Sequence, residues 1–573
     1  MKRTMGHALA AAWIGLASSV AGAQQTPLPS RQEVTPPTPD RQDASTVAVD
    51  VGAALERPPC PFENSPLRVS LNRVDFARPD GTALQPELAA ALAGLDFPTG
   101  DQPIAAVCTI RDRANAALRR GGWVASVQIP AQEVADGVLR LQVVAARIVE
   151  MRVRGEPGPY QALLADRIRR IQALDPLNER ETERLLLLAG DTPGLEVQLS
   201  LRPAGGEQGA VIGELTVAYR RFALLLNAQN YNSRFLGRET GYLRAEAYGL
   251  TGLADLTYLG LSATAQFEEQ RIVQVGHVFG LDGNGTTLGG RFTYAWSRPD
   301  LGALDFRTDT LITGFDVARP LVRSLRGNVR ARGGFDYIDQ DSEVRSNGAG
   351  VPLTTDRLRI FYAALDADHQ VVRADGSTAL AAAATVELRQ GVDLFGSSER
   401  GFTGGDLTSR IDGSARALVA RFNAEAVLGL GRIFSIAGQA QVQWANKPLL
   451  SYEEYSIGNL TIGRGYDPGS NSGDRAAGAR LELRANLPEV VGVSPQLFGF
   501  YDYLRIRNLD ENALERRRGF ESYGGGARVS LPGSLLLEVI YARPRDRILL
   551  LDERPPSDRI LVSLTAQFRD RAR

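Results

Sequence analysis

The chain has 573 residues, enough for roughly three or four domains, and its 65 basic residues nearly balance its 66 acidic ones. This balance gives no basic excess of the kind that binds nucleic acid, so no nucleic-acid partner is expected. Two cysteines and three histidines leave little material for a metal cluster or a nucleophile–histidine site, so the sequence predicts no metal, no cofactor and no enzyme.

The first residues have the composition of a secretory signal peptide. Lys2 and Arg3 precede an apolar run from about residue 8 to residue 20, and the small residues Ala-Gly-Ala follow at 21–23. We therefore expect residues 1–23 to be a signal peptide that is cleaved after Ala23. The alternative is a membrane anchor, but the run is short for a bilayer span, which needs about 20 apolar residues.

Residues 24–65 are rich in proline and polar residues, as in TPLPSRQEVTPPTPDRQD, and such a composition cannot bury a core. We expect a low-order periplasmic linker there. Export would also place Cys60 and Cys108 in an oxidising compartment. That environment favours a disulfide between them over a free buried pair.

From about residue 66 to residue 220 the order strand, helix, helix, strand, strand occurs twice. The first unit contains the strand pattern LRVSLNRVDF (67–76), a helix pattern at TIRDRANAALRRGG (109–122), and strands at WVASVQIP and GVLRLQVVAARI. In the second unit Asn178 is expected to cap the helix ERETERLLLLAG (179–190). The doubled order predicts two small α+β domains, at 66–147 and 148–220, rather than one larger domain.

Residues 221–573 lose the helical pattern and alternate instead. In FSIAGQAQVQW (434–444), the even positions are apolar or small, and the odd positions carry serine, alanine and glutamine. A soluble sandwich would also alternate. The length of the region and a polar set of Gln, Asn, Ser and Glu favour an all-β, antiparallel transmembrane barrel with a wet lumen. At roughly 20–24 residues per strand and connection, an even number of strands gives about sixteen.

One glycine-rich segment interrupts this strand pattern. It reads LTIGRGYDPGSNSGD (460–474) and places Arg464 between Gly463 and Gly465. Read alone, such a segment is a solvated surface turn.

Together these features resemble the two-partner secretion transporters of Gram-negative bacteria, which are related to the barrel-assembly proteins of the outer membrane. LRRGGWVASVQIPAQEVADGVLRLQVVAARI is similar to the family's first polypeptide-transport-associated (POTRA) domain, and LNERETERLLLLAGDTPGLEVQLSLRPA is similar to its second. Gly463-Arg464-Gly465-Tyr466 resembles the Val-Arg-Gly-Tyr motif of the family's long inward-folded sixth loop. LFGFYDYLRI resembles the barrel-wall motif whose acid meets that arginine, which by position is Asp502.

The resemblance implies that the loop, at about 460–480, folds into the lumen and is tethered there by Arg464 and Asp502. Physical chemistry favours such a partner, because an arginine taken out of water is costly unless its planar fork is satisfied. Gly463, Gly465 and Tyr466 belong to the same motif. The alternative is a solvated extracellular turn.

The resemblance also implies that each POTRA domain is a three-stranded sheet covered by two helices, with an exposed edge. An unfolded client can add a strand at such an edge through main-chain hydrogen bonds. The candidate edges are VASVQI in the first domain and LEVQLS in the second. The client-binding residues expected in the first domain are Val124, Val127, Ile129, Pro130 and Gln132. The alternative is that these are ordinary strands protected by the neighbouring domain.

The function that follows is an outer-membrane transporter with periplasmic POTRA domains. It would carry one unfolded exoprotein, an adhesin or cytolysin bearing an N-terminal secretion domain, through the barrel to the cell surface. No nucleotide is expected, because no G-x-x-x-x-G-K loop occurs. Outer-membrane lipid and the barrel-assembly machinery are the other expected partners.

Two further functions remain open at this point. A barrel-assembly insertase is the main alternative, although two POTRA repeats are few for that class. A passive porin is disfavoured by the inward loop motif.

Overall fold

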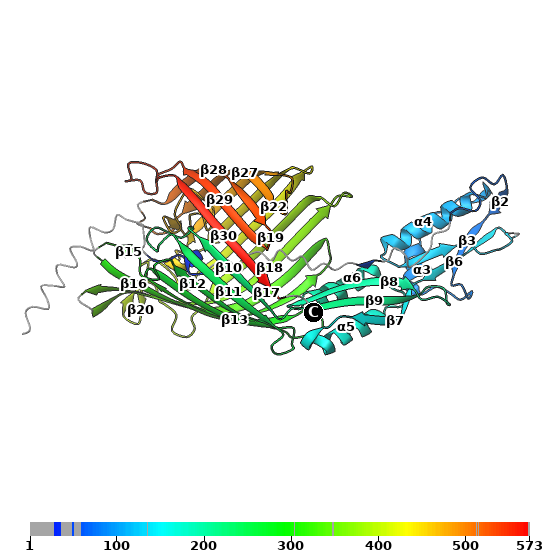
Figure 1. The fold of residues 1–573 in the computed structure, drawn as a ribbon, viewed down its shortest axis with the longest axis horizontal. Helices are drawn as coiled ribbons and strands as arrows, with labels where there is room; N and C mark the ends of the chain where they lie inside the picture. Colours follow the sequence, from blue (N-terminus) through cyan, green and yellow to red (C-terminus); the bar gives the residue numbers. More distant parts are fainter. Residues whose placement is uncertain are drawn as a thin grey trace, which may run out of the picture.

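The computed structural model describes residues 28–35, 49–50, 59–134, 136–302, 304–346, 349–511, 513 and 515–570. The expected signal peptide, residues 1–23, lies outside these described residues, as does most of the expected linker. The described chain forms a barrel from which an arm of two small domains extends (Figure 1). None of the helices within the described ranges is long and apolar enough to cross a membrane.

Domain 1, expected at 66–147, contains two helices on a small sheet. Its elements are β2 (Arg68–Leu71), β3 (Arg73–Ala77), α3 (Pro86–Leu92), β4 (Gly100–Pro103), α4 (Ala106–Arg120), β5 (Ala125–Gln128) and β6 (Val138–Ala145). The sheet has the order β3-β6-β5, and β2 pairs with β4. The single strand expected at 67–76 is divided, because the main chain at Asn72 turns to donate a hydrogen bond to Gly137. The helix expected from Thr109 begins earlier, at Ala106.

A disulfide joins Cys60 to Cys108 on α4, which lies 48 positions later in the sequence. Because a cross-link reduces the entropy of the unfolded chain, Cys60→Ser is expected to lower the free energy of unfolding of domain 1 by about 3–4 kcal/mol. Urea unfolding followed by the fluorescence of Trp123 measures this. Reduction of the unmodified protein should give the same shift, and an unchanged midpoint in both would contradict the expectation.

Domain 2, expected at 148–220, repeats the architecture. Its elements are β7 (Arg147–Arg154), the 3-10 helix η1 (Gly158–Tyr160), α5 (Gln161–Gln172), α6 (Glu179–Gly190), β8 (Leu195–Pro203) and β9 (Ala210–Tyr219). The sheet has the order β1-β8-β9-β7, in which the short strand β1 (Val49–Asp50) comes from the region expected to be a linker. The side chain of Asn178 accepts hydrogen bonds from the main chain of Arg180 and Glu181, so the predicted cap of α6 is confirmed.

Main-chain hydrogen bonds connect the two domains of the arm. Val124 N donates to Leu177 O at 3.1 Å, and Glu179 N donates to Gly122 O at 2.8 Å. Asn178 adds a side-chain hydrogen bond from its Nδ2 to Gly121 O at 3.2 Å. These contacts hold the domains in one relative orientation, so the arm presents both sheets as one unit.

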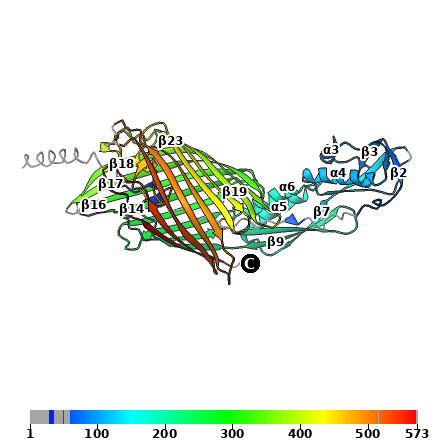
Figure 2. The ribbon, with the colours of Figure 1, turned by 90° about the horizontal axis from the view of Figure 1, so that it is seen from above.

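Sixteen long antiparallel strands within the described residues close into a barrel, which confirms the predicted fold class and strand number. They are β10 (Phe222–Gln229), β11 (Thr240–Tyr248), β12 (Leu256–Thr264), β13 (Gln270–Gly280), β14 (Thr287–Ser297), β16 (Leu304–Val322), β17 (Gly327–Ser346), β18 (Ala349–Val372), β19 (Thr378–Gly391), β22 (Leu418–Leu430), β23 (Phe434–Ala445), β26 (Arg475–Asn486), β27 (Ser494–Arg507), β28 (Arg517–Leu531), β29 (Leu535–Pro544) and β30 (Arg559–Arg569). β10 pairs with β30 and closes the cylinder. Figure 2 shows the strands tilted across the wall.

Shorter elements lie in the connections and in the lumen. They are α2 (Arg31–Val34), β15 (Asp300–Leu301), β20 (Phe402–Thr403), β21 (Asp406–Leu407), the 3-10 helix η2 (Ser451–Glu453), β24 (Tyr455–Ser456) and β25 (Ser472–Gly473). α2 lies in a segment for which the sequence predicts low order.

Domain 2 contacts the turns at one end of the barrel, which we call the arm rim; the opposite end is the loop rim. Burial raises the pKa of the Tyr160 hydroxyl, so it stays protonated and donates to Pro193 O at 3.0 Å beside this contact. The polar contacts with the turns include Tyr219 Oη to Tyr248 O at 2.6 Å, Arg170 Nη1 to Gly283 O at 2.8 Å, and Arg323 Nη2 to Asp191 Oδ1 at 2.6 Å. The arm is therefore fixed to several consecutive turns.

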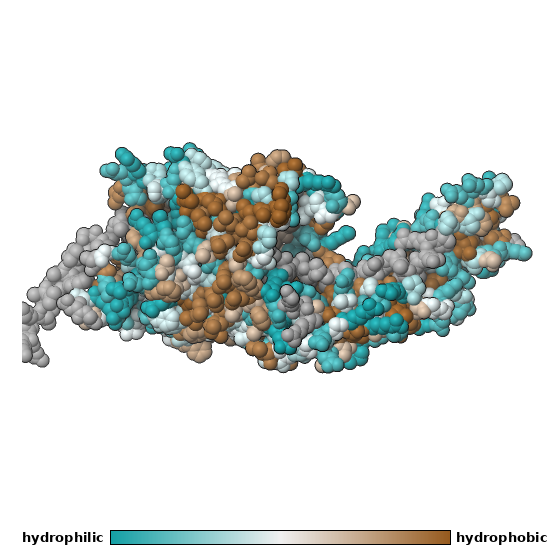
Figure 3. All heavy atoms as spheres, in the orientation of Figure 1, coloured by the Kyte–Doolittle hydropathy of each residue, from teal (hydrophilic) through white to brown (hydrophobic). Residues whose placement is uncertain are grey.

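The wall has an apolar outside and a polar inside, as the alternation at 434–444 predicts. Trp444 is 42% exposed on the outside, whereas its neighbour Gln443 is 2% exposed on the inside. Figure 3 shows apolar side chains gathered over the middle of the wall, with polar side chains towards the loop rim at the left. This is the pattern of a wall that faces lipid outside and water within.

Candidate functional site

The connection between β23 and β26 (446–474) folds back into the barrel instead of extending from the loop rim. Its stem is the short hairpin in which β24 pairs with β25. Its tip is enclosed: Arg464 is 3% exposed and Tyr466 is 0% exposed. We call residues 446–474 the luminal loop.

Arg464 at the tip of the luminal loop pairs with Asp502 on the inner face of β27. Its Nη2 lies 2.8 Å from Asp502 Oδ1 and its Nε lies 3.2 Å from Asp502 Oδ2. The main-chain N of Arg464 also donates to Asp502 Oδ2 at 2.9 Å. The structure thus brings together the two residues that the sequence motifs single out.

A second carboxylate completes the guanidinium's surroundings. Arg464 Nη1 donates to Glu482 Oε1 on β26 at 2.5 Å, and its Cζ lies 3.5 Å from the centroid of the Phe500 ring. Arg528 and Arg484 also donate to Glu482, at 3.1 and 2.8 Å. Because each buried charge has an oppositely charged partner, the desolvation cost of the cluster is offset.

The residues around Arg464 each have a steric role. Gly463 has φ of +115°, a conformation that a valine would not adopt, which explains the glycine where the related motif has valine. A Cβ on Gly465 would lie 2.7 Å from Pro544 N, so glycine is needed for this close approach. Tyr466 donates from its hydroxyl to Glu521 O at 2.8 Å and packs against Phe520.

The luminal loop has a second anchor, which sequence reasoning missed. Glu453 accepts from Arg389 Nη2 of β19 at 3.0 Å and from Arg421 Nη2 of β22 at 2.7 Å. Gln443 donates to the main-chain oxygen of Glu453 at 3.0 Å. The loop is therefore held at its tip by β26 and β27 and at its base by β19 and β22.

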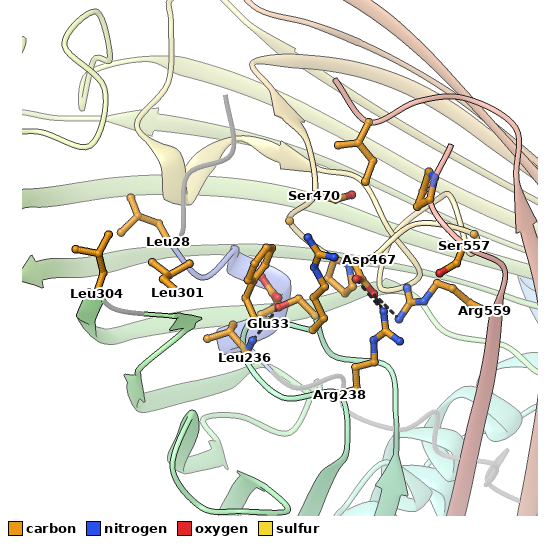
Figure 4. A pocket seen from close by; sticks show the side chains of 18 residues that line it. Leu28, Glu33, Leu236, Arg238, Leu301, Leu304, Asp467, Ser470, Ser557 and Arg559 are labelled. Carbon is orange, nitrogen blue, oxygen red and sulfur yellow. Dashed lines mark hydrogen bonds and ion pairs between the residues drawn. The ribbon is translucent and has the colours of Figure 1, made fainter. Parts of the chain in front are cut away.

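A short segment (28–35) that includes α2 lies beside the luminal loop. Figure 4 shows Glu33 of this segment and Asp467 of the loop at a cavity of about 490 Å³, with Arg238 and Arg559 directed at Asp467. Arg559 Nη2 lies 2.9 Å from Asp467 Oδ1. Val34 is 0% exposed and packs on an apolar strip of the inner wall that includes Ile272.

Below the loop, the lumen is hollow and polar. A cavity of about 780 Å³ is lined by Asp368, Glu425, Gln439, Arg480 and Arg528, among others. Within the described ranges, no group of three or more His, Cys, Asp or Glu side chains could hold a metal ion. Because the lining of the cavity carries both acidic and basic side chains, the site can bind and position charged chain segments through ion pairs and hydrogen bonds.

The expected client residues of domain 1 differ in accessibility. Val127 is 1% exposed in the core of domain 1, and Val124 is 8% exposed against the core of domain 2. Ile129, Pro130 and Gln132 are only partly buried. Gln132 is engaged at both ends, with Arg140 N and Arg140 O at 2.8 and 2.6 Å. Of the five expected client residues, Ile129 and Pro130 therefore have side chains that are partly exposed and not engaged at both ends as Gln132 is.

Comparison with known proteins agrees with this architecture. The family model of the haemolysin secretion/activation proteins ShlB/FhaC/HecB matches residues 215–529. The heme/hemopexin transporter protein HuxB of Haemophilus influenzae (strain ATCC 51907 / DSM 11121 / KW20 / Rd) is 21% identical over 444 residues, which cover 74% of each chain.

Solved structures share the fold. CdiB from Escherichia coli has a TM-score of 0.70 at 16% identity, with 90% of this chain and 94% of that chain covered. CdiB from Acinetobacter baumannii has a TM-score of 0.65 at 14% identity, with 98% of each chain covered. The family match supports the secretion transporter over the barrel-assembly insertase. With more than half of its length matched, the chain belongs to the haemolysin secretion/activation protein family ShlB/FhaC/HecB, the two-partner secretion transporters that secrete an exoprotein through a β-barrel.

Proposed function

We propose that this transporter takes one unfolded exoprotein from its POTRA arm, on the periplasmic side, and passes it through the lumen of an outer-membrane barrel to the cell surface without nucleotide. The observation that carries the proposal is the doubly anchored luminal loop, with Arg464 on Asp502 and Glu453 on Arg389 and Arg421. The exoprotein is an adhesin or cytolysin with an N-terminal secretion domain.

The sheet edges of the arm support client capture by strand addition. The outer edge of β5 is partly blocked, because Val127 N donates to the side chain of Asn115 at 2.9 Å. The edge of β8 accepts an added strand, since β1 pairs with it in parallel at Leu199 and Ser200. An unfolded client can take the place of β1 there, through main-chain hydrogen bonds with little demand on its sequence.

Co-expression of this chain with a candidate exoprotein that bears an N-terminal secretion domain tests the function. The exoprotein should become accessible to external protease only when the transporter is present. Retention of the exoprotein inside the cell, with the barrel inserted, would overturn the proposal.

Two segments occupy the lumen, residues 28–35 and the luminal loop, and residues 28–35 are held more weakly. Arg31 Nη1, Gln32 Oε1 and Glu33 Oε1 are buried without a hydrogen-bond partner within the described residues. Such unsatisfied atoms weaken the hold on the segment. The luminal loop, in contrast, is held by paired charges at both anchors.

A charge at Val34 is therefore expected to expel this segment. Val34→Asp would bury a carboxylate among apolar side chains, which is strongly unfavourable. The single-channel conductance in planar bilayers should rise. Thr35→Asp is the matched control. Thr35 is exposed, so this substitution adds the same charge one residue later without burying it. Equal conductance for Val34→Asp and the unmodified protein would show that the segment does not occlude the lumen.

A further inference from the structure

A row of arginine side chains crosses the outside of the barrel at the loop rim. Arg475 begins β26, Arg507 ends β27 and Arg517 begins β28. The strand registers place Arg475 opposite Arg507, and Arg507 opposite Arg517. Arg505 lies on the same face of β27, two residues nearer the arm rim. We call these four residues the arginine row.

The alternation of the strands directs this row outward. On β27, Leu504 is 0% and Ile506 is 3% exposed on the inner face, so Arg505 and Arg507 project from the outer face, where both are exposed. Arg517 is exposed as well. The row thus faces the surroundings of the barrel and not its lumen.

The charge of the row is not compensated by the protein. Like charges directly opposite each other on neighbouring strands are destabilising. Within the part of the chain that the structure describes, Arg507 and Arg517 form neither an ion pair nor a side-chain hydrogen bond. Arg475 is half-buried and donates from its Nε to Ala445 O at 2.8 Å. Arg475 and Arg505 also contact aromatic rings, with Cζ 5.2 Å from the Trp444 centroid and 5.7 Å from that of Tyr503. The luminal arginines of the two loop anchors, in contrast, all have carboxylate partners.

Aromatic side chains place the row at the boundary of the lipid. Trp444, Tyr501 and Tyr523 are each 42% exposed on the outer face, and Tyr501 is opposite Tyr523. Aromatic girdles of this kind mark the membrane–water interface of barrels. The arginine row lies beyond these tyrosines in the direction of the loop rim. It is therefore level with the headgroups of the leaflet on that side.

We propose that the arginine row binds the phosphorylated headgroup of lipopolysaccharide in the outer leaflet of the outer membrane. The planar guanidinium matches phosphate geometry and forms two parallel hydrogen bonds to it. Gly519 is opposite Arg505, and a Cβ there would meet nothing within 4 Å, which leaves room for a headgroup. This lipid site is separate from the transport path in the lumen and rests on the proposed orientation, with the arm in the periplasm and the loop rim at the cell surface.

Titration of full-length protein in detergent with purified lipopolysaccharide tests the site. The variant Arg507→Gln/Arg517→Gln should bind about tenfold more weakly, since each arginine near an anionic lipid surface adds to affinity. Arg271→Gln/Arg432→Gln is the matched control, because it removes the same charge from two other exposed arginines, one near each rim. The control should bind as the unmodified protein does.

Titration of the unmodified protein with other ligands shows whether the bound phosphate must belong to lipopolysaccharide. Dephosphorylated lipopolysaccharide should bind about as weakly as the intact lipid binds the double variant. Equal affinity of the double variant and the unmodified protein would overturn the proposal. So would equal binding of phosphatidylglycerol vesicles, or full competition by millimolar inorganic phosphate.

Discussion

Replacement of Arg464 by alanine is expected to lower exoprotein secretion by about tenfold or more, while the barrel still inserts into the membrane. The substitution removes the guanidinium that Asp502 and Glu482 share at the tip of the luminal loop. Asp502 is 0% exposed, so it would keep a buried charge with one partner fewer. Surface exposure of the exoprotein, measured by protease accessibility, gives the result.

The effect follows from the size of the interaction that is lost. Removal of one partner from a buried ion pair costs about 3–5 kcal/mol, because the other charge stays desolvated. Arg480 also donates to Asp502, at 3.2 Å, and keeps part of the charge compensated. We therefore expect the tip to detach without unfolding of the wall.

Arg484→Ala is the matched control for this experiment. Arg484 lies on the same luminal wall and donates to Glu482 Oε2 at 2.8 Å, but within the described chain it forms no hydrogen bond or ion pair with the luminal loop. It should secrete at close to the normal level. Normal secretion by Arg464→Ala, with an inserted barrel, would mean that the tether has no part in transport.

Much of this arrangement follows from local patterns. Period-two alternation places Trp444 outside and Gln443 inside, because side-chain direction in a strand depends only on the parity of the position. The cap of α6 is equally local, since Asn178 bonds main-chain groups two and three residues away. The Arg464 tether could be expected because its motif and that of Asp502 each have a recognisable sequence.

The base anchor of the loop could not be expected in the same way. Glu453 meets Arg389 and Arg421 only because the loop leaves β23 and folds back along the inner faces of β22 and β19, the next two strands of the sheet. One signal was available: two adjacent acids, Glu453 and Glu454, in a loop whose flanking strands carry inward arginines. Nothing in the sequence, however, fixes which arginine they reach.

The luminal position of 28–35 is also a tertiary effect. The segment is mostly polar, so its composition predicts a linker. A four-residue helix also has little intrinsic stability, so no local pattern predicts α2. The apolar strip that accepts Val34 is assembled from β13, β14, β16, β17 and β18 together with Leu450 and Tyr452 of the loop. Only the closed barrel presents that surface.

Glu453→Gln is expected to release the base of the luminal loop and lower the stability of the barrel. Glu453 is 3% exposed, and the substitution leaves Arg389 and Arg421 buried with one carboxylate fewer. The loss should be about 3–5 kcal/mol in the free energy of unfolding. Guanidinium unfolding in detergent, followed by circular dichroism, measures it. Glu425→Gln is the matched control, because Glu425 lines the same lumen without an ion pair in the described chain.

Combining this change with Arg464→Ala shows whether the two anchors are independent. The tip uses Asp502 and Glu482, whereas the base uses Arg389 and Arg421, so the anchors share no partner. Losses at separate sites without shared partners add to within about 0.5 kcal/mol. The double variant should therefore lose the sum of the two single losses. A double loss equal to the larger single loss would mean that release of one end already frees the other.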